Sequence, residues 1–377
     1  MTDQRSATTA SAGNSTTATF RPTTPQAPAG EPIVSVSRGL AAWLTANQTS
    51  LALSSYQTGR LFLVGVLPDG TVSIHQQPFA RVMGLWWTSN RLYLASRVQF
   101  WRLENILSPG ELADGQFDAV LVARSGHITG NIDSHEVAID SEGRPVFVNS
   151  AYSCLATLDP VHSFRPIWKP TFISELVPED RCHLNGLAML NGKPKYVTAV
   201  AQTDEADGWH GQPLPKGVLI DVETDKVVTD NLSMPHSPRV VDGKVYALDS
   251  GRGFLVQIDP ETGNVTDLAF CPGWLRGLAI KGNHALVTVS KPRYGSFEGL
   301  PIDTEMKKRS ATPECGVLII DLTTGETIEW LKLAGSVEEL FAVELMPGVK
   351  CPMAIGPSSL EIVDRITFDP DVRPLAD

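Results

Sequence analysis

Three histidines are the residues whose type and placement in this sequence best suit chemistry. His135, His183 and His236 stand at corresponding positions of three successive copies of a short repeat. Neutral imidazole is the commonest metal ligand in proteins, and a nearby carboxylate can complete the ligand set. The available carboxylates are Asp133, Glu338 and Glu339. Such a set suits Zn, Fe or Mn, so we expect a divalent transition metal. The alternative is that each histidine only satisfies backbone groups.

Cations form a second group close to the same repeat. They are Arg181, Arg239, Arg276, Lys291 and Arg293, in a protein whose formal net charge is −11. Guanidinium groups bind carboxylate, phosphate or sulfate through paired hydrogen bonds, which predicts an anion site. The alternative is pairing within the protein, for example of Arg181 with Asp180 or of Arg276 with Glu339.

The two groups together predict roles for individual side chains. We expect Arg276, Arg239 and Glu339 to act in catalysis. We expect Arg181, Asn185, Asn149, Lys291 and Arg293 to bind the substrate. Other histidines, namely His75, His127, His162, His210 and His284, lie outside the repeat positions and are expected to be structural.

The elements that must position these residues are short β-strands in a degenerate repeat. Segments such as 91–95, 145–149, 244–249 and 284–290 are rich in β-branched or aromatic residues and end in turn residues. Six copies of a small–Leu–Ala motif or a relative of it recur at intervals of about 40 to 60 residues. Four-stranded blades account for this spacing, so we predict an all-β, six-bladed β-propeller.

The ring is expected to close by combining strands from both ends of the chain. The first blade begins at its second strand, over residues 51–57, and its innermost strand comes from residues 341–345. This arrangement protects sheet edges that would otherwise pair with other chains. Because innermost strands start on one face and second strands return to it, the histidines and arginines are expected on that face. Two insertions, residues 202–216 and 291–314, are expected to roof it.

Composition bounds the rest of the chain. Residues 1–32 are rich in Thr, Ser, Ala and Pro and are expected to be a disordered tail, followed by the propeller over 33–365 and a C-terminal tail over 366–377. No apolar run is long enough to cross a membrane, and the acidic balance argues against nucleic-acid binding. The five scattered cysteines and the absence of a secretory signal favour the cytoplasm.

Several longer motifs resemble a known bacterial family. They are YQTGRLFL at 56–63, FVNS at 147–150, DRCHLNGLAM at 180–189, MPHSPR at 234–239 and CPGWLRG at 271–277. The resemblance covers roughly residues 43–355 and points to conserved proteins that occur alone or fused to tetratricopeptide repeats. It implies a propeller-like fold and no catalytic residue. Six-bladed lactonases, strictosidine-synthase-like proteins and streptogramin lyases are similar at the level of fold only, and such propellers often hold a metal at the top of the channel.

Two functions are therefore expected from the sequence. The first is a metal-dependent enzyme acting on a small anionic or carbonyl-bearing substrate or a peptide, by hydrolase or lyase chemistry or by an oxidative reaction. The second is a non-catalytic propeller that binds a peptide, a protein or a small anion at the same face.

Overall fold

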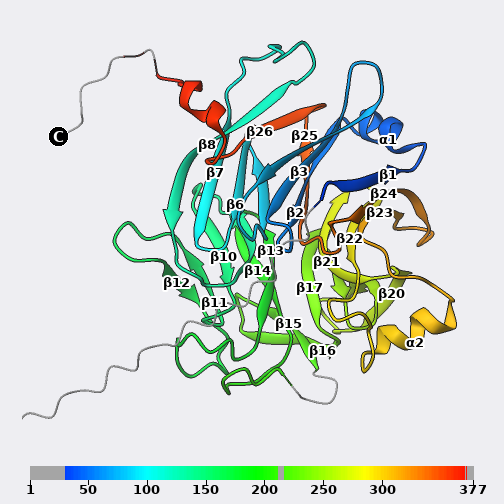
Figure 1. Cartoon of the computed structure of the whole chain (residues 1–377). Coiled ribbons are helices and arrows are strands. Elements are labelled where there is room, and N and C mark those ends of the chain that lie inside the picture. The colour runs from blue at the N-terminus through cyan, green and yellow to red at the C-terminus, as the bar shows by residue number, and fades with distance from the viewer. Residues whose placement is uncertain (1–29, 211–215, 370, 372–377) are drawn as a thin grey trace, which may run out of the picture.

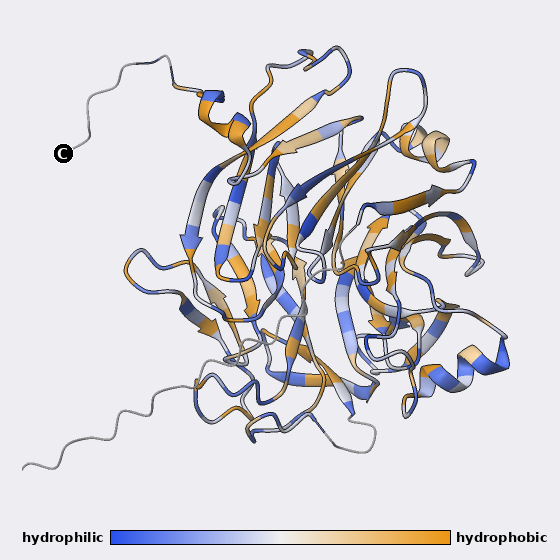
Figure 2. Cartoon of the chain, viewed as in Figure 1, coloured by the Kyte–Doolittle hydropathy of each residue, from blue (hydrophilic) through white to orange (hydrophobic). Residues whose placement is uncertain are grey.

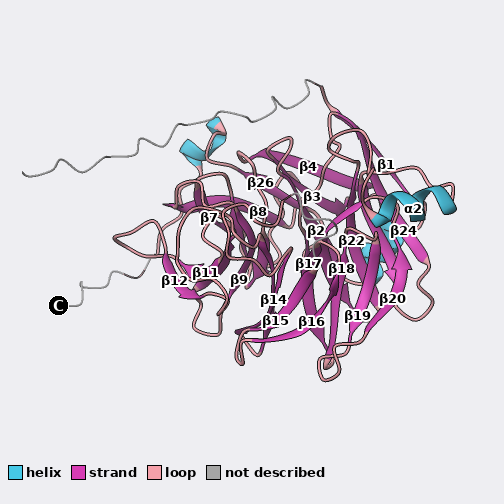
Figure 3. Ribbon diagram, turned by 90° about the horizontal axis from the view of Figure 1, so that it is seen from below, coloured by secondary structure: helices cyan, strands magenta, loops and turns pink. Residues whose placement is uncertain are grey.

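The protein forms a ring of six β-sheets around a central channel, which confirms the predicted six-bladed propeller (Figures 1 and 3). The structure is a computed structural model that describes residues 30–210, 216–369 and 371. Most of the tail expected over 1–32 and the last residues of the tail expected over 366–377 lie outside this range, and the domain bounds stay a prediction. No helix in the described part of the chain is both long and apolar enough to cross a bilayer.

Each blade runs from an innermost strand at the channel to an outer edge. Blade 1 is β25 (Val343–Pro347), β2 (Thr49–Ser55), β3 (Arg60–Val66) and β4 (Val72–Pro78). Blade 2 is β5 (Leu85–Thr88), β6 (Arg91–Ala95), β7 (Gln99–Asn105), β8 (Ala119–Ile128) and β26 (Pro352–Ile355). Blade 3 is β9 (Ser134–Ile139), β10 (Pro145–Asn149), β11 (Cys154–Thr157) and β12 (Arg165–Trp168).

The remaining blades complete the ring. Blade 4 is β13 (Leu184–Leu190), β14 (Lys193–Ala199), β15 (Gly217–Asp221) and β16 (Lys226–Leu232). Blade 5 is β17 (Pro235–Val241), β18 (Lys244–Asp249), β19 (Phe254–Ile258) and β20 (Val265–Phe270). Blade 6 is β21 (Trp274–Lys281), β22 (His284–Ser290), β23 (Gly316–Asp321), β24 (Thr327–Gly335) and β1 (Pro32–Val36).

The ring closes as predicted, because β25 from the C-terminal part pairs antiparallel with β2 from the N-terminal part. Leu51 lies opposite Leu345 in this pairing. Two more terminal strands cover outer edges: β26 adds in parallel to β8, and β1 adds antiparallel to β24. The N-terminal strand β1 thus extends blade 6, which comes late in the chain. The C-terminal strand β26 extends blade 2, which comes early in the chain.

In the described chain two α-helices lie outside the ring, and a short 3₁₀ helix, η1 (Leu360–Asp364), follows the last strand (Figure 3). The first, α1 (Leu40–Ala46), buries Leu40, Trp43 and Leu44. The second, α2 (Pro301–Lys308), lies in the insertion 291–314, which was expected only as a loop. Ile302 and Met306 stand one turn apart, so they share the helix face that packs against Phe270 and Trp274. Its outer surface is largely hydrophilic (Figure 2).

Close packing between innermost strands fixes their relative register. A Cβ atom on Gly84 would lie 2.5 Å from the His135 carbonyl oxygen, and one on Gly277 would lie 2.5 Å from the Phe341 carbonyl oxygen. Such separations are below any real contact, so only glycine fits at these two positions. The six residues at this level are Gly84, Glu136, Gly186, Ser237, Gly277 and Ala342.

The residues that precede these six in the sequence form two tiers of side chains at the channel mouth. Three residues earlier stands the upper tier, which is Arg81, Asp133, His183, Met234, Trp274 and Glu339. One residue earlier stands the lower tier, which is Met83, His135, Asn185, His236, Arg276 and Phe341. The expectation that the three histidines occupy corresponding positions is therefore wrong: His183 belongs to the upper tier, and His135 and His236 belong to the lower tier.

Candidate functional site

A cavity of about 370 Å³ opens at the channel mouth on the predicted face. All six upper-tier residues line it, together with Met83, His135, His236 and Arg276 from the lower tier. The two insertions contribute to it as expected, the first through Trp209 and His210 and the second through Tyr294, Ser296, Phe297 and Leu300. His210 was expected to be structural and instead lies at this cavity.

Left-handed backbone recurs in the upper tier. Arg81, Asp133, His183 and Met234 have φ angles of 52°, 50°, 47° and 48°. Non-glycine residues adopt this conformation only where the surrounding structure requires it, because it costs roughly 1 kcal/mol or more per residue. The same turn therefore leads the chain into the channel in four blades and fixes the starting points of the side chains that line the cavity.

A serine holds His135 in one tautomer. Its Nδ1 lies 2.8 Å from the Asp133 carbonyl oxygen and 2.7 Å from Ser150 Oγ. Ser150 Oγ also donates its single hydrogen to the Leu184 carbonyl oxygen of the next blade. The hydroxyl must then accept from the ring, so we infer that Nδ1 carries the proton and that Nε2 carries a free lone pair.

His236 repeats this arrangement two blades further on. Its Nδ1 lies 2.9 Å from the Met234 carbonyl oxygen and 3.0 Å from Ser250 Oγ. Ser250 Oγ in turn donates to the Leu275 carbonyl oxygen at 2.7 Å. The same reasoning leaves Nε2 of His236 unprotonated.

His183 is oriented through a carboxylate. Its Nδ1 lies 2.8 Å from Asp180 Oδ2, and the Trp209 indole N–H donates to the same oxygen at 3.1 Å. The Trp209 ring lies over the imidazole with centroids 4.2 Å apart. Within the described residues, none of the three histidine Nε2 atoms has a hydrogen-bond partner. An outward Nδ1–H bond that orients a free Nε2 is the usual support of a metal-binding histidine.

One group of potential ligand atoms is tight enough for a metal ion. The ligand atoms of Asp133, His135 and His183 all lie within 4.8 Å of one another. His236 lies outside this group, although it lines the same cavity. Two of the three predicted histidines thus come together, and Asp133, considered as a completing carboxylate, takes the third place.

Protonation states in this group suit metal binding. Burial lowers the pKa of His135 to about 4, so its imidazole is neutral at physiological pH. Burial opposes ionisation of Asp133, yet His135 and Arg81 nearby hold its pKa below the ordinary value. Arg81 donates to Asp133 Oδ1 at 2.6 Å, which leaves Oδ2 free of that bond. Neutral imidazoles and an ionised carboxylate are the forms that ligate cations.

The other side of the cavity is cationic. The Arg276 guanidinium lies over the Tyr56 ring, 5.1 Å from its centroid, and 3.4 Å from Glu339 Oε2. Arg293 shares the same carboxylate at 3.2 Å and bonds the Tyr56 hydroxyl. Burial raises the pKa of Glu339 to about 7 and lowers that of Arg276 to about 9. Glu339 can therefore exchange a proton near neutral pH, as an acid–base group must.

Four predicted site residues do not line this cavity. Arg239 makes two bonds to Glu136, of 2.9 and 3.0 Å, at a deeper level of the channel. Arg181 is already paired with Glu179 and Asp204. Asn149 and Asn185 are buried, and their side-chain oxygens accept from the Tyr152 amide and the Thr198 hydroxyl. Ion pairs within the protein thus hold both arginines, whereas the side-chain nitrogens of Asn149 and Asn185 are buried without a partner in the described structure.

Sequence reasoning missed several residues of the cavity wall. Tyr56, Met234 and Trp274 line it, as does Trp209 from the first insertion. The repeat could have predicted Met234 and Trp274, because each stands three positions before the small residue of its repeat, as the other upper-tier residues do. Tyr56 and Trp209 belong to loops, whose side-chain directions the repeat does not specify.

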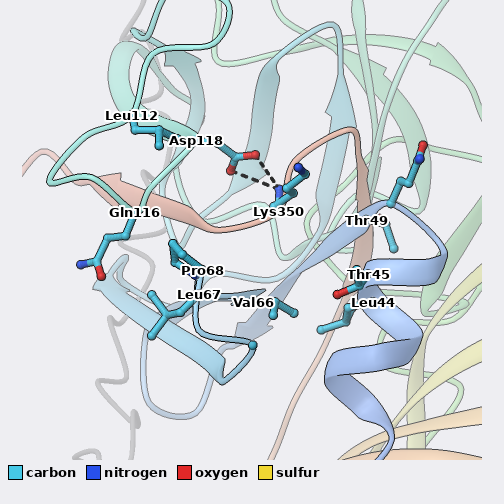
Figure 4. Close-up of a pocket in the computed structure, with 12 residues that line it drawn as sticks. Leu44, Thr45, Thr49, Val66, Leu67, Pro68, Leu112, Gln116, Asp118 and Lys350 are labelled. Carbon is cyan, nitrogen blue, oxygen red and sulfur yellow. Dashed lines mark hydrogen bonds between the residues drawn. The ribbon is translucent and has the colours of Figure 1, made fainter.

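A second cavity, of about 410 Å³, opens on the opposite face (Figure 4). Leu44 of α1, Leu67, Pro68 and Leu112 give it a largely apolar wall. Its carboxylate, Asp118, accepts from the Lys350 amide at 3.1 and 2.9 Å. Among the described residues, its wall has no histidine and no group of potential metal ligands, so the cavity with the histidines is the candidate site.

The chain was compared with protein families, curated proteins and solved structures. No curated protein matches the chain. Among solved structures, a nidogen/laminin complex has a TM-score of 0.52 at 13% identity, covering 80% of this chain and 99% of that one. This likeness supports the fold alone. A designed protein, Ika8, has a TM-score of 0.35 at 12% identity over 80% of each chain. A family model described as a domain of unknown function, DUF4915, matches residues 38–355, so the chain belongs to the DUF4915 family.

Proposed function

We propose that the channel-mouth cavity is the active site of a metal-dependent enzyme that acts on a small anionic or carbonyl-bearing substrate. Asp133, His135 and His183 would hold a divalent transition metal such as Zn, Fe or Mn. The observation that carries the proposal is the grouping of these three ligand atoms within 4.8 Å, with each histidine Nδ1 tied to the protein.

The chemistry follows from the number of ligands. Three protein ligands leave coordination positions open, as in catalytic rather than structural metal sites. A metal in such a site polarises a carbonyl or activates water, which suits hydrolysis or elimination. Arg276 would hold an anionic group, and Glu339 would transfer a proton.

A second function, binding of a small anion without catalysis, is favoured by one observation. The cationic side of the cavity is built from residues that are not in the metal-ligand group. Binding of an anion there, in a protein that takes up no metal, would favour this function over the enzyme.

Elemental analysis of untagged protein purified without chelator tests the metal site. We expect one transition-metal ion per chain in the native protein, and less than a tenth of that in Asp133→Asn, His135→Ala and His183→Ala, because each removes one of three ligands. His162→Ala is the matched control, since that imidazole is 77% exposed, bonds Asp159 and does not line the cavity. All variants should melt near the native temperature. Metal-free native protein, or equal metal in all variants, would contradict the proposal.

A further inference from the structure

The cationic side of the cavity has more positive than negative groups. Arg276, Lys291 and Arg293 line the cavity there. Glu339 Oε2 lies 3.4 Å from the Arg276 guanidinium and 3.2 Å from that of Arg293. The Lys291 ammonium lies 3.8 Å from Glu338 Oε1. Two carboxylates thus face three cations. This local excess of positive charge occurs in a protein whose net charge is −11, and it would be balanced by one further anionic group.

Arg276 has donors that the described residues do not satisfy. Its side chain is 13% exposed, and its one side-chain hydrogen bond in this part of the chain is the 3.4 Å contact with Glu339. Its Nε is buried without a partner. A buried guanidinium with unfilled donors is costly, whereas a carboxylate can accept two parallel bonds from it. The Tyr56 and Phe341 rings, 5.1 and 5.8 Å from the guanidinium carbon, hold its plane in place.

One aromatic ring separates this guanidinium from the metal-ligand group. Phe341 lies 5.8 Å from Arg276, and its centroid is 5.5 Å from that of His135. His135 in turn meets His183 with centroids 4.9 Å apart. A molecule that contacts both ends therefore needs an anionic group and a second polar group joined by a short spacer.

The remaining wall is apolar and aromatic. Trp274 and Phe297 are stacked with centroids 6.3 Å apart, and Met234 and Leu300 lie on the same cavity. Pockets with such walls bind ligands that carry an apolar body, because burying that body supplies most of the affinity. Inorganic phosphate or sulfate would leave this wall uncovered.

We propose that Arg276 and Arg293 form a carboxylate subsite for a small carboxylic acid whose apolar body lies against Trp274 and Phe297 and whose second polar group reaches the metal. This inference rests on the proposed function and names its substrate class. The subsite contains no metal ligand, so carboxylate binding can be measured on metal-free protein, and its failure can be told apart from failure of the metal site.

The experiment uses the full chain, stripped of metal with chelator and dialysed. The probes are 3-phenylpropionate, its neutral analogue 3-phenylpropan-1-ol and inorganic phosphate, followed by calorimetry and by tryptophan fluorescence, because Trp209 and Trp274 line the cavity. We expect saturable binding of the carboxylate and at least about tenfold weaker binding of the alcohol and of phosphate. Preference for phosphate would overturn the carboxylate assignment, and absence of all binding would overturn the subsite.

Variants locate the binding. Arg276→Gln and Arg293→Gln should each raise the Kd for 3-phenylpropionate about tenfold or more. Arg293 is 47% exposed, so its replacement tests the subsite even where Arg276→Gln does not fold. Arg144→Gln is the matched control, because that arginine pairs with Asp140 at the β9–β10 turn and should leave the Kd unchanged. Equal Kd values in all variants would overturn the proposal. Native protein that takes up metal but binds no carboxylate would leave the proposed function standing.

Discussion

At the scale of single residues, the site depends on how each imidazole is oriented. His135 and His236 are each held by a serine at the end of the second strand of their blade, and that serine also bonds the next blade. The two arrangements are alike, yet only His135 belongs to the group of potential metal ligands. The pair therefore offers an internal comparison between a histidine that binds the proposed metal and one that does not.

Ser150→Ala should weaken metal binding about tenfold or more, because loss of an outer hydrogen bond frees the ring and tautomer of a ligand. Ser250→Ala, which changes the same bond at His236, should leave metal affinity unchanged. Titration of apo protein with Zn²⁺ against a competing chelator measures both. Equal losses in the two variants would mean that His236 is also a ligand, as the sequence pattern suggested.

A half-buried carboxyl group below the site is expected to make stability depend on pH. Burial raises the pKa of Glu344 to about 8, while Arg239 is already paired with Glu136. The native protein therefore holds this proton more tightly than the unfolded chain, whose glutamates titrate near 4.3. Its contribution is fully present below about pH 4 and is lost as the pH rises through about 8.

Glu344→Gln should remove this loss. We expect the free energy of unfolding to fall from pH 5 to pH 8 more steeply in the native protein, by at most about 1.4 kcal/mol per pH unit, and the variant to be the more stable at pH 8. Urea unfolding of both proteins at pH 5, 6.5 and 8 measures the difference. Parallel curves would show that Glu344 is ionised in the folded state.

At the scale of elements, residues that pack between blades and residues that line the cavity come from neighbouring positions of one strand. Leu187 of β13 is 4% exposed and packs between blades, while His183 just precedes that strand at the cavity. Leu187→Ala should cost about 2–5 kcal/mol of unfolding free energy because it leaves a cavity between blades. Its metal content should match that of the native protein. A loss of metal with little loss of stability would reverse these assignments.

Strand positions and closure could be predicted from the sequence, because alternation and turn residues are local signals. The register between blades could not be predicted, since it depends on Gly84, Gly186 and Gly277 meeting the backbone of the next blade. That register decides which tier His183 occupies. Arg239 was misplaced for a similar reason: its partner, Glu136, stands 103 residues away in the chain. Helix α2 was missed because it lies within an insertion outside the repeat.

At the scale of the whole molecule, closure depends on residues that follow the last complete blade. Ending the chain after Glu339 should abolish cooperative unfolding, because β2 and β8 then each lose a paired strand and Phe341 leaves the channel. Ending it after residue 365 retains every strand and should leave the melting temperature nearly unchanged. Calorimetry and size-exclusion chromatography compare the two. A monomeric, cooperatively melting shorter chain would show that closure is not needed for folding.

Closure by β25 also sets the point during synthesis at which the cavity at the channel mouth is completed. Strands β2 and β25 are separated by almost the whole chain, and contacts of such long range form slowly. Glu339 and Phe341, which complete the two tiers, leave the ribosome after the other ten residues at the channel mouth. A nascent chain can thus form strands β5 to β24 blade by blade, while the cavity at the channel mouth stays incomplete until translation is nearly finished. Chains whose translation is interrupted before Glu339 would accordingly lack the complete cavity.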